Sequence, residues 1–89
     1  MSDDVPQEFY DLADQFVHLA NALVPEHGIS RVSSVIMFAA SRFNAHCAHE
    51  LDPDVDHNPD DAISYMVEQY RKMVTDNFIR LGQIRAAEH

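Results

Sequence analysis

Apolar side chains recur every three or four residues along three long segments of this chain. The segments span about residues 6–24, 30–50 and 58–81, and this spacing puts the apolar side chains on one face of a helix with 3.6 residues per turn. A β-strand would need a period of two, which does not fit. With two glycines and four prolines among 89 residues, few positions interrupt the pattern. The sequence therefore predicts an all-α fold.

Start and stop signals set the expected helix boundaries. Pro25 ends the first segment, Ser30 is a suitable N-cap for the second, and Asn58 followed by Pro59 is a strong start for the third. Gly82 is the expected C-terminal stop of the third helix. We expect residues 83–89 to form a frayed tail.

The expected connections are short, so consecutive helices should run in opposite directions. The predicted architecture is an up-down-up antiparallel three-helix bundle, with residues 1–89 forming a single domain. A chain of this length can hide only roughly 60–65% of the surface exposed when it is unfolded. Its core is therefore expected to be small.

Fifteen acidic and six basic residues give a formal net charge of −9. Phosphate backbones and anionic lipids should repel such a chain, because binding to them needs clustered cations. The longest strongly apolar run, residues 35–40, is far shorter than the roughly 20 residues of a membrane span. We expect no nucleic-acid partner and no membrane partner.

One cysteine, Cys47, excludes an internal disulfide and fits a reducing compartment. The N-terminal residues 1–6 show no basic start followed by an apolar stretch, so no secretion signal is expected there. These features predict a cytoplasmic protein.

The antiparallel topology would gather acidic and histidine side chains at one end of the bundle, around residues 46–61. The candidate metal ligands there are His46, His49, Glu50, Asp52, Asp54, Asp56 and His57. Alternate acidic residues between two helices resemble a calcium-binding loop, but His57 stands where that loop needs glycine and Ile63 where it needs glutamate. Surface residues at helix ends explain the cluster more simply, and divalent-metal binding is kept as the alternative function.

No catalytic arrangement stands out. Asp14 and His18 lie one helical turn apart, which is an ordinary surface spacing. The chain has no glycine-rich phosphate loop and no nucleophile elbow. We expect neither enzymatic activity nor a cofactor.

The second helix is predicted to be apolar nearly all round in its middle, because Met37 and Phe38 widen its stripe. Such a helix needs neighbours on two sides. We therefore expect a protein–protein interaction or self-associating module, whose partner is another protein or a second copy. The expected interaction residues are Val35, Met37, Phe38, Tyr10 and Tyr65.

Three stretches, Phe9–Phe16, Phe38–Ala45 and Ala62–Met73, carry a family resemblance. Together they resemble a family of small proteobacterial proteins known as domain of unknown function number 3144, from about residue 8 to residue 79. The resemblance implies a cytoplasmic bacterial protein. It brings no activity, cofactor or catalytic residue.

Overall fold

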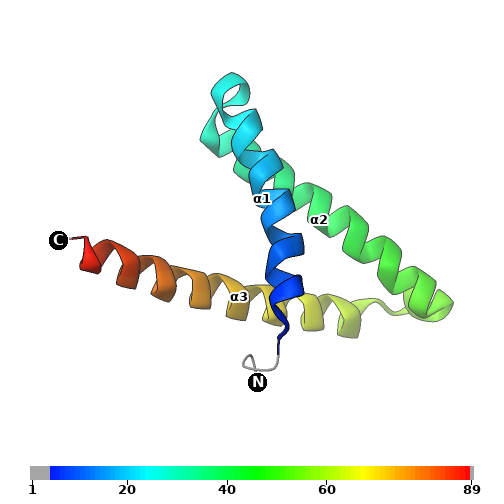
Figure 1. The fold of residues 1–89 in the computed structure, drawn as a ribbon. Helices are drawn as coiled ribbons and strands as arrows, with labels where there is room; N and C mark the ends of the chain where they lie inside the picture. The colour runs from blue at the N-terminus through cyan, green and yellow to red at the C-terminus, as the bar shows by residue number, and fades with distance from the viewer. Residues whose placement is uncertain (1–4, 89) are drawn as a thin grey trace. The chain divides into compact units, whose positions relative to one another are not determined.

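The computed structural model describes residues 5–88 as three α-helices and one 3-10 helix (Figure 1). The elements in chain order are α1 (Gln7–His27), α2 (Ile29–Leu51), η2 (Pro53–His57) and α3 (Asp60–Ala87). No residue from 5 to 88 lies in a strand. The predicted all-α class with three long helices is confirmed.

The chain divides into two compact units, Met1–Ala45 and His46–His89. Helix α2 contributes to both units, because its last turns belong with η2 and α3. The antiparallel arrangement of all three helices in one domain stays a prediction of the sequence.

In the first unit the chain turns back at Gly28, which alone separates α1 from α2 (Figure 1). Its N–H donates to the carbonyl of Val24 at 2.8 Å, and its carbonyl accepts from the N–H of Val32 at 3.1 Å. The φ of Gly28 is 87° and its ψ is 149°, a combination that only glycine adopts readily. The turn is therefore shorter than the connection over residues 25–29 that the predicted helix ends imply, and it depends on this glycine.

Helix α1 continues to His27, beyond the predicted end at residue 24. Pro25 lies inside its last turn, where the missing proline N–H removes a single backbone hydrogen bond. A proline so close to the end of a helix is tolerated, and the sequence signal placed the end too early.

Burial in the first unit is concentrated beside the turn. Val32 is the one buried residue among residues 5–88, with 7% of its surface exposed. Ala20 and Val24 on α1 are half-buried. Farther from the turn the apolar residues are exposed, so this unit has a core of only a few side chains.

In the second unit, η2 connects α2 to α3. The Asp52 carboxylate accepts a hydrogen bond from the N–H of Asp54 at 3.1 Å and caps η2, which has Pro53 in its first turn. Asn58 was predicted to cap the third helix, but its N–H donates to the carbonyl of Val55 at the end of η2. Helix α3 begins at Asp60 without a side-chain cap.

The expected end of α3 at residue 81 and the frayed tail at 83–89 are corrected by the structure. Helix α3 runs through Gly82 to Ala87. Gly82 lacks the positive φ that would make it a C-terminal stop, and several good helix formers follow it. The last residue of the predicted tail, His89, lies outside the described residues.

Replacing each glycine with alanine should change stability in opposite directions. Gly28→Ala should lower the free energy of unfolding by about 1–3 kcal/mol, because alanine is strained at that φ and ψ. Gly82→Ala should raise it by about 0.5–1 kcal/mol, because no side chain lies within 4 Å and alanine favours the helix. Urea unfolding at one fixed protein concentration measures both. A neutral Gly28→Ala variant would contradict the role given to the turn.

Candidate interaction surface

The middle of α2 exposes the three residues predicted there for protein contact. Val35 is 55% exposed, Met37 53% and Phe38 60%. At about 100° per residue, Val35 lies about 60° around the helix from the buried Val32. By the same geometry Met37 and Phe38 lie about 140° and 120° from Val32, on opposite sides. A neighbour that covers the Val32 side of α2 therefore leaves Met37 and Phe38 uncovered.

The Phe38 ring is held by its own helix. The guanidinium carbon of Arg42 lies 5.0 Å from the ring centroid, which is a cation–π contact. The Ser41 hydroxyl donates to the Phe38 carbonyl at 2.7 Å. Because a local contact already orders the ring, a partner that binds here has less side-chain entropy to overcome.

The two tyrosines predicted for the same function lie on other helices. Tyr10, on α1, is 40% exposed, and its ring meets that of Phe9 edge to face with centroids 5.6 Å apart. Tyr65, on α3 in the second unit, is 67% exposed. All five predicted contact residues are therefore accessible in the described chain.

The metal candidates around residues 46–61 lie on the end of α2 and on η2, and all of them are exposed. His49 Nδ1 lies 3.0 Å from Asp56 Oδ2, which forms an ion pair when the imidazole is protonated. Asp52 is engaged in capping the backbone of Asp54. Among residues 5–88, no three histidine, cysteine or acidic residues are placed to hold one ion. The metal-binding alternative stays a prediction that titration with zinc and calcium tests.

Sequence reasoning did not include the apolar end of α3 in the candidate surface. Phe78 is 72% exposed, Ile79 56% and Ile84 49%. Phe78 lies within the predicted third helix, residues 58–81, but Ile84 was assigned to the frayed tail. Helical spacing continued past Gly82 would have found Ile84.

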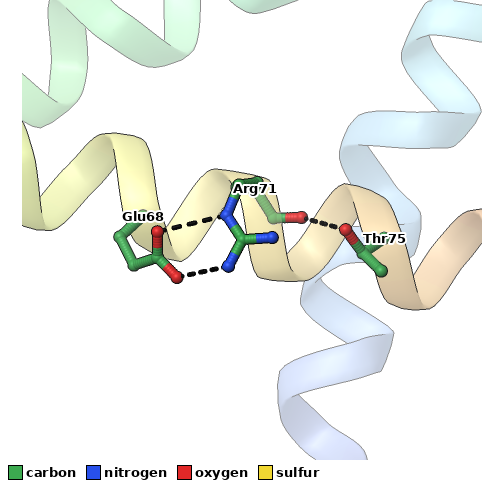
Figure 2. A network of polar contacts seen from close by, with 3 residues as sticks. All are labelled: Glu68, Arg71 and Thr75. Carbon is green, nitrogen blue, oxygen red and sulfur yellow. Dashed lines mark hydrogen bonds and ion pairs between the residues drawn. The ribbon is translucent and has the colours of Figure 1, made fainter.

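Polar contacts within α3 stabilise its middle (Figure 2). Arg71 donates two hydrogen bonds to the Glu68 carboxylate, at 3.1 and 2.7 Å, and the Arg71 carbonyl accepts from the Thr75 hydroxyl at 2.7 Å. The hydrogen bonds from Arg71 lower the pKa of the Glu68 carboxyl, and they raise the pKa of Arg71. Arg71 is thereby engaged with its own helix.

Removing the Arg71 guanidinium should raise the pKa of Glu68 toward its ordinary value. We expect Arg71→Met to do this more than Lys72→Met, because Lys72 acts only through weaker Coulomb attraction. A lowered carboxyl pKa stabilises the fold above the pKa of the unfolded state, and the effect is lost as pH falls through the folded pKa. NMR titration of the Glu68 side chain measures the shift. Equal shifts in the two variants would show that the hydrogen bonds do not form.

Among the described residues, no helix has the length and apolar character needed to cross a membrane. No curated protein and no solved structure shows significant similarity to the chain. A family profile described as Protein of unknown function (DUF3144) matches residues 9–80, which is most of the chain. The chain therefore belongs to the DUF3144 family, as the resemblance in its three helical stretches indicated.

Proposed function

We propose that this protein is a self-associating module that acts by binding rather than by catalysis. A second copy of the chain covers apolar helix faces that each unit leaves exposed. The middle of α2, at Val35, Met37 and Phe38, forms part of the contact.

The exposure of the phenylalanines supports this proposal most directly. All five are more than half exposed, and the lowest value is 52%. Each phenylalanine would be at least as exposed in its own unit alone, because the atoms of the other unit can only cover surface, never uncover it. Burying one such side chain is worth about 1.5–3 kcal/mol. A surface with this many exposed aromatic side chains is typical of a protein–protein contact.

The charge pattern favours α2 as a place where two copies meet. Each copy carries a net charge of −9, so two copies repel each other over most of their surface. Residues 32–41 include no charged side chain. Two copies can therefore approach each other along the middle of α2 without placing like charges in contact.

We propose the cytoplasm as the location of this module and a bacterium as its source. Cys47 is a free, half-buried thiol, which suits a reducing compartment. The excess of acidic residues supports a protein partner over nucleic acid or an anionic membrane surface.

Substituting the exposed apolar residues of α2 should weaken self-association. We expect Phe38→Ser and Met37→Ser each to raise the dimer dissociation constant about tenfold or more, since each removes about 1.5–3 kcal/mol of burial. Leu51→Ser is the matched control, because Leu51 is an 88% exposed apolar residue at the end of the same helix. Sedimentation equilibrium across a concentration series measures the constants.

The same experiment can contradict the proposal in two ways. A mass that stays at the monomer value of 10.1 kDa up to high micromolar concentration removes self-association. A dimer that responds equally to the Phe38 and Leu51 substitutions removes the middle of α2 from the contact.

A further inference from the structure

Besides the middle of α2, an apolar face of helix α3 is exposed, and it has the spacing of a coiled-coil seam. Its positions alternate by four and three residues over three heptads, a spacing that lets two helices pack along their length. We name this set the α3 seam: Ile63, Val67, Tyr70, Val74, Asn77, Leu81 and Ile84. Apart from the half-buried Val74, its apolar members are 41–62% exposed.

One amide side chain of the seam already has a hydrogen-bond partner within α3. Asn77, the one amide of the seam, donates from its side chain to the Met73 carbonyl at 2.9 Å. Arg71, beside the seam, is held by Glu68. A helix that covers the seam therefore leaves the Asn77 side-chain donor with its hydrogen-bond partner.

Helix α3 changes from acidic to basic after Tyr70, and we call the 11 residues before this point its acidic half and the 17 residues after it its basic half. Residues 60–70 contain three acids and no base, a net charge of −3. Residues 71–87 contain four bases and one acid, a net charge of +3. Arg80 and Arg85 directly flank the seam members Leu81 and Ile84.

From these observations we infer that two copies of the chain pair through their α3 seams in antiparallel orientation. Packed helices lie about 8–10 Å apart, which is within about one Debye length at physiological salt. Antiparallel pairing sets each acidic half against the partner's basic half, whereas parallel pairing sets like charges together. This inference rests on the proposed self-association and identifies the helix and direction involved.

Cysteine crosslinking of the full chain tests the direction. In a Cys47→Ser background, Ile63→Cys and Leu81→Cys each place one thiol near an end of the seam. The two positions are about 27 Å apart along the helix at 1.5 Å per residue. With a short bismaleimide reagent, an equilibrated mixture of the two variants should give at least fivefold more covalent dimer than either variant alone. More dimer from either variant alone than from the mixture would overturn antiparallel pairing.

Charge reversal tests the same pairing without new cysteines. Arg80→Glu should raise the dissociation constant about tenfold, because it turns attraction by the partner's acidic half into repulsion. Lys72→Glu is the matched control, since it makes the same charge change in the same half of α3 but on the side away from the seam. We expect it to change the constant less than threefold.

The outcomes separate this inference from the proposed function. A chain that is monomeric at all concentrations removes both. A dimer that Arg80→Glu tightens indicates parallel pairing, and a dimer that Arg80→Glu and Lys72→Glu affect equally shows that the α3 seam is not in contact. Either result overturns antiparallel pairing through the α3 seam but does not contradict self-association through α2.

Discussion

The burial of apolar helix faces is the interaction on which this protein depends. Helices gain most of their stability in water from packing an apolar face against something else. In residues 5–88 only Val32 is buried, and all the phenylalanines are more than half exposed. The apolar side chains that allow the chain to fold are therefore also the main surface available for contact with a partner.

Charge then decides where such contact is favourable. The net charge of −9 opposes the meeting of two copies in general, but the uncharged middle of α2 and the oppositely charged halves of α3 are local exceptions. In the proposed dimer, two copies avoid charge repulsion at the middle of α2, and antiparallel pairing of the α3 helices makes the charge interaction between them attractive. These two features are the reason that we propose a second copy of the chain as the partner, rather than an arbitrary apolar surface.

The alternate acidic residues between α2 and α3 resemble a metal-binding loop, but two of them have local structural contacts. Asp52 caps the 3-10 turn that Pro53 favours, and Asp56 Oδ2 lies 3.0 Å from His49 Nδ1. These two carboxylates thus have contacts within the connection itself. Alternate acidic residues converge on an ion only when the backbone turns them inward, as glycine permits in a calcium-binding loop.

The sequence by itself determined the helical class, the number of long helices and the apolar stripe on each, because these follow from spacing and from few helix breakers. It did not determine which of the proline and glycine residues interrupt a helix. Pro25 and Gly82 lie within helices while Gly28 makes the turn, since the effect of such residues depends on the φ and ψ that their surroundings impose. Only the tertiary structure decided which apolar side chains are covered. Spacing shows that Val32 and Phe38 are both apolar positions of α2, but burial depends on neighbouring elements, and these cover Val32 and leave Phe38 exposed.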